Sequence, residues 1–155
     1  MSKGKPTPDL TKGALAGLMG GLAGAGAKLG AEYFFPPRRD GRTPPSVALA
    51  EQVTQRTLEG KERQVTQQTI HFVVGALAGA VYGALVEFEP SLAAWHGAAF
   101  GITLNRFTHE SLLPRLGLSA APNRQPTQER ISEWVTHAVY GAATETVRRA
   151  LRKGM

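Results

Sequence analysis

The stretch Gly75-Ala76-Leu77-Ala78-Gly79-Ala80-Val81-Tyr82-Gly83 places a small residue at every fourth position of an apolar run. Positions four apart lie on one face of an α-helix, so these three glycines form a ridge without side chains. In water, each interior glycine costs a helix about 1 kcal/mol relative to alanine. In a bilayer, such ridges let two helices approach closely enough to associate. The stretch therefore favours a membrane helix that packs against a neighbour.

Working outward, the pattern predicts four helices, over residues 12–35, 65–88, 91–113 and 128–152. The first carries Gly13, Gly17 and Gly21, and the third carries Gly97 and Gly101. About twenty apolar residues suffice to cross a bilayer core. The sequence thus predicts an all-α, single-domain membrane bundle of about four transmembrane helices with small-xxx-small packing. A soluble Ala/Gly-rich bundle is the alternative, favoured by the charges in the last two segments.

A polar connection, rich in proline and arginine, separates the first two apolar runs over residues 36–64. Its paired prolines exclude a helix over 36–46, and Ser46 is placed to cap a polar helix over about 47–59. We expect the hydrophilic segment 61–68 to continue as helix into the second apolar run.

Composition excludes several classes of function. The chain has no cysteine, which rules out a disulfide framework, a thiol nucleophile, a Cys-ligated zinc site and an iron–sulfur cluster. Its net charge of +6 is spread over termini and connections without interleaved aromatic residues. Membrane lipids with anionic headgroups are therefore the expected partners, and nucleic acid is not. No nucleophile–base pair stands out, so we expect no enzyme. Basic residues flank both ends of the helices and fix no orientation.

Ionisable residues gather near one predicted membrane face. If the four helices cross the membrane in alternating directions, the first and third helices end at the same membrane face at which the second and fourth begin. This face is here called face X. Charged groups at membrane depth are costly and mark candidate sites. The set near face X is Lys28, Glu32, His71, His109, Glu110, Glu133 and His137. The opposite face holds a thinner set, which includes Glu87 and Glu145.

Three uses of this set stay open. Its imidazoles can titrate between about pH 5 and 8. Imidazole with carboxylate is a normal ligand set for a transition metal. The groups can also form a static network that fixes helix register. A haem held between His71 and His137 is a further alternative. The sequence lacks HExxH or any other close ligand spacing, so we expect no bound metal or cofactor.

The order of several motifs resembles the YagU-like family of bacterial inner-membrane proteins. Four motifs carry this resemblance. The first two are Lys28-Leu29-Gly30-Ala31-Glu32 before Pro36-Pro37-Arg38, and His71-Phe72 before the glycine ladder. The other two are Phe107-Thr108-His109 before Pro114, and Ser132-Glu133 with His137. The resemblance implies a small multi-pass inner-membrane protein, linked to survival in acid, with cytoplasmic termini and face X toward the periplasm. The first connection is shorter and more polar than the family pattern.

We therefore expect a non-enzymatic, pH-responsive inner-membrane protein that contributes to acid tolerance through the ionisable set. We also expect self-association or association with another membrane protein through small-residue ridges. One alternative is an accessory subunit of a larger membrane complex, in which the polar set only holds register. Another is a small transporter or channel, which would have to be oligomeric.

Overall fold

The computed structural model describes residues 8–38 and 42–155, and over these residues the chain is all-α, without a β-strand. Residues 39–41 of the predicted connection 36–64 lie outside the described residues. The long helices are α1 (Leu10–Phe34), α3 (Gly60–Phe88) and α6 (Thr127–Gly154). The shorter elements are α2 (Pro45–Thr54), η1 (Pro90–Gly97), α4 (Ala98–Phe107), η2 (Thr108–Leu112), α5 (Leu113–Arg115) and η3 (Pro122–Arg124).

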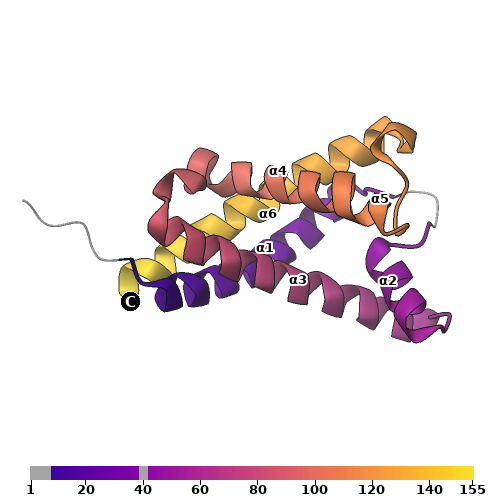
Figure 1. The fold of residues 1–155 in the computed structure, drawn as a ribbon, viewed down its shortest axis with the longest axis horizontal. Coiled ribbons are helices and arrows are strands. Elements are labelled where there is room, and N and C mark those ends of the chain that lie inside the picture. The colour runs from indigo at the N-terminus through magenta and orange to yellow at the C-terminus, as the bar shows by residue number, and fades with distance from the viewer. Residues whose placement is uncertain (1–7, 39–41) are drawn as a thin grey trace, which may run out of the picture.

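The long helices form one bundle, which α4 completes. α1 packs against both α3 and α6, and α4 packs on α6 (Figure 1). The start of α1 and the C-terminus lie at one end of the bundle, and α2 and α5 lie at the other (Figure 1). That second end holds the residues assigned to face X. α3 and α4 diverge toward this end (Figure 1), and a cavity lies between them there.

Glycines let the helices approach to backbone contact. A Cβ added at Gly17, Gly79 or Gly83 would lie closer than 3.0 Å to the backbone of the facing helix, in the α1–α3 contact. Gly97 and Gly101 stand in the same relation to the backbone of α6. Gly75, nearer face X, leaves a little more room, because its added Cβ would lie 3.0 Å from the Cβ of Ala25. Since backbone atoms cannot move aside, alanine at the closest positions would push the helices apart.

The third predicted helix, 91–113, is wrong in its first part and irregular in its last. Pro90–Gly97 forms a 3₁₀ segment in which Trp95, His96 and Gly97 all have positive φ, and the α-helix begins only at Ala98. Residues 108–112 form a π-helical turn ahead of Pro114. A proline ring clashes with the carbonyl four residues earlier, which accounts for the wider turn there.

Smaller differences concern the connection and the second helix. α2 spans Pro45–Thr54 and ends where Gln55 adopts left-handed backbone angles, so the polar helix is shorter than the predicted 47–59. α3 begins at Gly60, ahead of the predicted residue 65, because the hydrophilic segment before the apolar run is itself helical.

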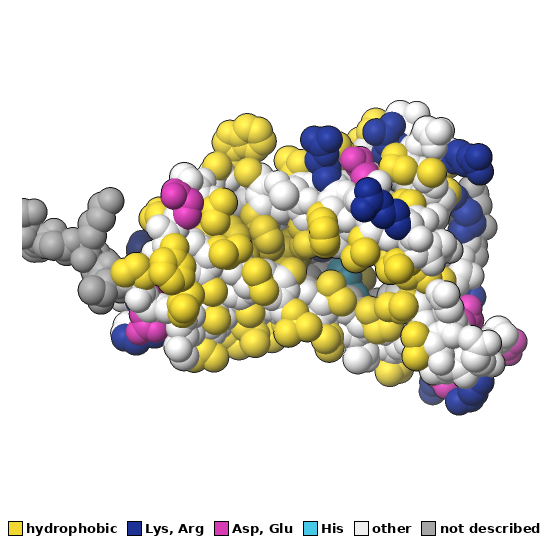
Figure 2. Space-filling model, in the orientation of Figure 1, with side chains coloured by type: hydrophobic (Ala, Val, Ile, Leu, Met, Phe, Trp, Pro, Cys, Tyr) yellow, Lys and Arg dark blue, Asp and Glu magenta, His cyan; other side chains and the backbone are white. Residues whose placement is uncertain are grey.

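The distribution of side chains is inverted relative to a water-soluble bundle. The face that α6 buries is almost entirely polar: Glu129, Ser132, Glu133, Thr136, His137, Tyr140, Gly141, Thr144, Glu145 and Arg148. Its outer face carries the exposed Ile131, Val135 and Val139. On the face shown in Figure 2, apolar side chains cover the middle of the bundle and charged side chains gather toward its two ends.

Two helices, α1 and α3, are long and apolar enough to cross a membrane. α6 is nearly as long as α3, with 28 residues against 29, but it carries Glu133, Glu145 and Arg148. α4 is too short by itself. By length and composition the described residues therefore contain two candidate spanning helices, against the predicted four.

Candidate functional site

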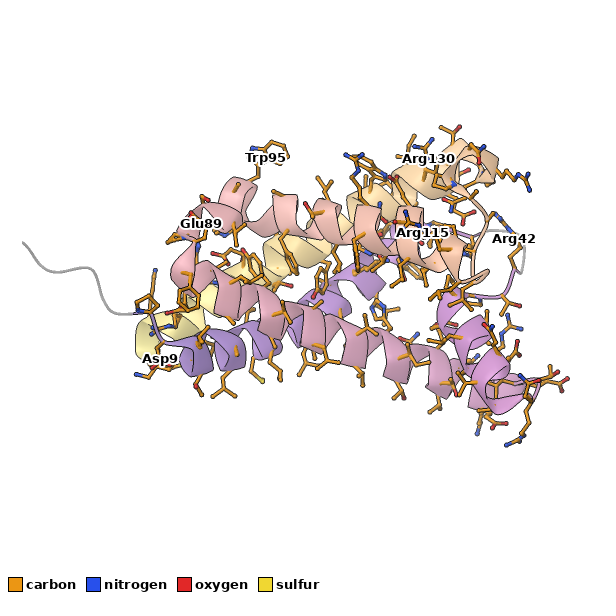
Figure 3. All side chains as sticks on the ribbon, in the orientation of Figure 1. Asp9, Arg42, Glu89, Trp95, Arg115 and Arg130 are labelled. Carbon is orange, nitrogen blue, oxygen red and sulfur yellow. The ribbon has the colours of Figure 1, made fainter. Side chains whose placement is uncertain are left out.

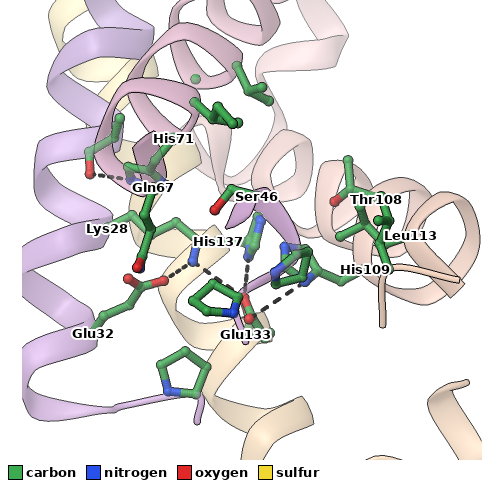
Figure 4. Close-up of a pocket in the computed structure, with 18 of the residues that line it drawn as sticks. Lys28, Glu32, Ser46, Gln67, His71, Thr108, His109, Leu113, Glu133 and His137 are labelled. Atoms are coloured by element: carbon green, nitrogen blue, oxygen red, sulfur yellow. Dashed lines mark hydrogen bonds and ion pairs between the residues drawn. The ribbon is translucent and has the colours of Figure 1, made fainter. Parts of the chain in front are cut away.

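Glu133 is the centre of a buried polar cluster at the end of the bundle near α2 and α5 (Figure 4). Only 4% of its side chain is exposed. Its Oε2 lies 3.3 Å from Lys28 Nζ and 3.4 Å from His137 Nδ1. Its Oε1 lies 3.4 Å from Nη2 of Arg38 and 3.6 Å from His109 Nδ1. One carboxylate thus joins α1, the segment after α1, η2 and α6.

Local helix geometry orients the two imidazoles. His137 follows Glu133 by one turn of α6, and its Nδ1 lies 2.8 Å from the backbone oxygen of Glu133. A proton on this nitrogen lets the ring donate to that carbonyl, which fixes the ring against the helix. His109 comes from the π-helical turn η2, and its ring meets that of His137 edge to face at a centroid distance of 5.0 Å. The irregular turn therefore brings the second imidazole to the site.

A second layer of ion pairs surrounds Glu133. Lys28 also contacts the carboxylate of Glu32. The guanidinium of Arg38 lies 3.5 Å from Glu129, and Arg42 donates to the same carboxylate at 2.6 Å. The cluster's Lys and Arg side chains are therefore matched by an equal number of carboxylates, from Glu32, Glu129 and Glu133. Such pairing is what keeps buried charges tolerable.

Of the predicted site residues, five meet in the Glu133 cluster, one lines the cavity beside it and one points to other partners. Lys28, Glu32, His109, Glu133 and His137 meet in the cluster. His71 lines the same cavity, but its Nε2 lies 3.0 Å from the backbone oxygen of Ala25.

Glu110 turns away from the cluster, which corrects its assignment. Its Oε1 accepts a hydrogen bond of 2.7 Å from the indole of Trp134. Arg106 and Arg130 lie 3.8 Å and 4.0 Å from its carboxylate. The π-helical turn explains the division, because it points His109 and Glu110, adjacent in sequence, toward different partners.

Sequence reasoning missed three members of the cluster: Arg38, Arg42 and Glu129. Arg38 and Arg42 belong to the polar connection 36–64, from which the sequence predicted no site residue. Glu129 precedes Glu133 by one helical turn, and that spacing was a signal that both share a face of α6.

A cavity of about 500 Å³ lies beside the cluster, between α3 and α4–α5. Lys28, His71, His109, Glu133 and His137 form part of its lining. Figure 2 shows histidine atoms inside a hollow between α3 and the helices above it. The cluster is thus buried in the bundle and still bordered by open space.

Three side chains of the cluster lie close enough together to hold a metal ion. Ligand atoms of His109, Glu133 and His137 all lie within 4.8 Å of one another. Glu133 already shares its charge with Lys28 and Arg38, however, and a divalent cation would sit against both positive groups. His71 is engaged by the Ala25 carbonyl, which leaves it poorly placed as a haem ligand opposite His137.

A second buried network lies at the opposite end of the bundle. Glu145 is fully buried, accepts a hydrogen bond of 2.8 Å from Tyr82 and receives two from Arg148, at 2.6 Å and 2.9 Å. Glu87 receives two hydrogen bonds of 2.8 Å from Arg152. These bonds tie α3 to the C-terminal part of α6. Among the described residues, no histidine forms a hydrogen bond or ion pair with this network, so we interpret it as structural.

The family described as protein of unknown function DUF1440 has a model that matches residues 22–146. The chain belongs to this family. The DUF1440 match includes every residue of the Glu133 cluster, from Lys28 to His137. No curated protein and no solved structure matches the chain significantly. The DUF1440 description assigns no activity, so function has to be argued from the site.

Proposed function

We propose that this DUF1440 protein is a non-enzymatic, multi-pass inner-membrane protein whose Glu133 cluster responds to protons and contributes to acid tolerance. One observation carries the proposal: two imidazoles face a single buried carboxylate, within a cluster whose fixed charges are balanced. Histidine is the side chain whose unperturbed titration falls between about pH 5 and 8.

The inverted bundle supports a membrane location. A soluble protein seldom buries this many polar residues while exposing long apolar side chains. Here α3 exposes Val73, Leu77, Val81 and Leu85, whereas α6 buries its carboxylates. Buried ion pairs make a charged helix compatible with lipid, since polar side chains in membranes face the bundle interior. On this account α4–α5 and α6 enter the bilayer as parts of the bundle, with α1 and α3 as the apolar spans.

Proton uptake would unbalance the cluster. Lys28 and Glu32 face Glu133 from α1, Arg38 and Arg42 come from the segment after it, and Glu129 lies one turn away. His71 borders the cavity from α3. Each proton added to His109 or His137 introduces positive charge beside Lys28 and Arg38. We expect the resulting competition for Glu133 to loosen the contacts between α1, η2 and α6 at this end.

The orientation follows from the YagU-like resemblance, which implies cytoplasmic termini. The start of α1 and the end of α6 lie at the same end of the bundle (Figure 1). The Glu133 cluster would then lie toward the periplasm, where it meets the pH of the surroundings.

The test is acid survival of cells carrying Glu133→Gln together with His137→Ala. The control is Glu110→Gln, a carboxylate near the same face but outside the cluster. Loss of survival in the double variant, at wild-type abundance in the membrane and with a normal control, is the expected result. Full survival of the double variant would refute the role of the cluster.

A second candidate function is that of an accessory subunit in a larger membrane assembly. Gly26 and Gly30 lie four residues apart on α1, and a Cβ at either would meet no described atom within 4 Å. The ridge at Gly75, Gly79 and Gly83 already packs against α1. The ridge at Gly26 and Gly30 contacts no described residue of this chain, so a helix of another protein could pack against it. Gly26→Leu with Gly30→Leu should release a co-purifying partner if this role holds; an unchanged assembly state would exclude it.

A further inference from the structure

The cavity beside the Glu133 cluster is apolar along two walls. Ile70 and Val74 line it from α3, and Leu104, Leu112, Leu113 and Leu116 line it from α4 to the residue after α5. Val74, Leu112 and Leu116 are 49%, 40% and 51% exposed. These walls therefore continue onto the outer surface of the bundle, where α3 and α4 separate. In a bilayer, such an opening faces acyl chains.

The inner end of the same cavity is polar and charged. Its lining holds Lys28, Arg38 and Arg42 with Glu32 and Glu133, and Glu129 pairs with both arginines from outside the lining. Gln68 also lines it, and its Oε1 is buried without a hydrogen-bond partner among the described residues. A hydrogen-bond donor on a ligand would satisfy that acceptor.

An additional arginine stands at the rim. Arg115 lies on α5 between the lining residues Leu113 and Leu116, and its side chain is exposed. Figure 3 shows it on the same side of the molecule as the opening between α3 and α5. It makes no ion pair with residues 8–38 or 42–155, so its charge is available to a ligand.

We infer that this cavity binds an anionic amphiphile, with one acyl chain between α3 and α4–α5 and the head group among the arginines and the amide of Gln68. The inference rests on the proposed membrane location, because the chain enters from the lipid side. The volume of about 500 Å³ lies within the range of about 300–1,000 Å³ typical of small-molecule sites. Arg115, which has no carboxylate partner among the described residues, supplies the net positive charge that favours a negatively charged head group. An acyl chain with a negatively charged head group is offered both by an anionic phospholipid and by a free fatty acid. Of the two, only a phospholipid such as phosphatidylglycerol carries hydroxyl groups that can donate to Gln68 Oε1.

The experiment is retention of amphiphile by the full chain, purified in a non-ionic detergent at neutral pH and measured by native mass spectrometry. Phosphatidylglycerol, phosphatidylcholine with the same acyl chains, and palmitate are added separately. We expect one phosphatidylglycerol or one palmitate per chain, and much weaker retention of phosphatidylcholine. Retention of phosphatidylglycerol identifies a membrane phospholipid as the source, and retention of palmitate alone identifies a free fatty acid.

Two variants locate the binding. Val74→Trp fills the cavity and should abolish retention, whereas Val81→Trp, on the same helix but outside the cavity lining, should retain the amphiphile as the wild type does. Arg115→Gln changes an exposed residue and leaves the fold intact. It should weaken retention of the anionic amphiphile about fivefold, the effect of one arginine near an anionic headgroup.

Equal retention of phosphatidylcholine and phosphatidylglycerol would overturn the inference, as would undiminished retention by a folded Val74→Trp. If Val74→Trp fails to fold, unchanged retention by Arg115→Gln overturns it instead. These measurements avoid acid and leave His109 and His137 in place. If the protein does not retain the amphiphile, the proposed proton response is therefore unaffected. The acid-survival experiment tests that response separately.

Discussion

His137 Nδ1 lies 3.4 Å from the Oε2 of Glu133, and Lys28 Nζ reaches the same oxygen from α1 at 3.3 Å. The imidazole and the ammonium therefore share one acceptor, although they belong to different helices. His137 Nδ1 also lies 2.8 Å from the backbone oxygen of Glu133. The ring therefore cannot move away from the Glu133 carboxylate without also disturbing this second contact. This shared oxygen links the charge of an imidazole to the packing of α1 on α6.

Glu133→Gln should destabilise the protein. The change removes the buried charge opposite Lys28 and Arg38, and breaking one side of a buried ion pair typically costs about 3–5 kcal/mol. Glu32 and Glu129 still reach these cations, so we expect the lower end of that range. Thermal unfolding in detergent measures the effect. In the control Glu110→Gln, whose partners Arg106 and Arg130 are largely exposed, the cost should stay below about 1 kcal/mol. Equal shifts in the two variants would contradict the central role of Glu133.

Gly79→Ala should loosen the α1–α3 contact. The added methyl group would meet the backbone at Gly17 and Gly21, which cannot move aside without separating the helices. Overpacking of this kind typically costs about 1–3 kcal/mol. The matched control is Gly26→Ala, where the new methyl group meets no described atom within 4 Å. The melting temperature should fall only in the first variant, and a fall of the same size in both would mean that the backbone contact at Gly79 is not the cause.

Glu145→Gln should destabilise the bundle without altering its response to acid. Glu145 accepts hydrogen bonds from Tyr82, Arg148 and Arg149 at the end of the bundle remote from Glu133. Tyr82→Phe removes only one neutral donor and should cost about 1 kcal/mol, less than the carboxylate change. Unfolding temperature and acid survival, measured together, separate the two networks. Loss of survival in Glu145→Gln at normal abundance would show that this network has more than a structural role.

The helical fold was predictable because its signals are local. The glycine ladder at Gly75–Gly83 and the apolar stretch over 12–35 follow one period throughout, and α3 and α1 cover them. The segment 91–97 was not predictable in the same way. It has no interior glycine or proline after Pro90, yet Trp95 and His96 adopt positive φ. The close approach of Gly97 to Gly141 on α6 accompanies this conformation, and such a tertiary contact leaves no local signal.

The candidate site was predictable in part for a related reason. Helix direction alone brings His109, Glu133 and His137 to one end of the bundle. Arg38 and Arg42 lie outside the helices, so their positions depend on the packed elements that they contact rather than on a local pattern. The position of Glu110 along the chain predicted that it would join the cluster. It instead contacts Trp134, because residues 108–112 form a π-helical turn that the sequence did not predict.

The most direct test of the account is a pH titration of Trp134 fluorescence. Trp134 follows Glu133 on α6, and Trp95→Phe leaves it as the only tryptophan of the chain. The account predicts a sigmoidal change on acidification from about pH 8, as His109 and His137 take up protons. His109→Gln with His137→Gln should abolish the change, whereas Glu110→Gln, which removes the indole's own carboxylate partner, should preserve it. A profile that survives in the histidine variant, or that is absent from the parent protein, would contradict a proton-responsive Glu133 cluster.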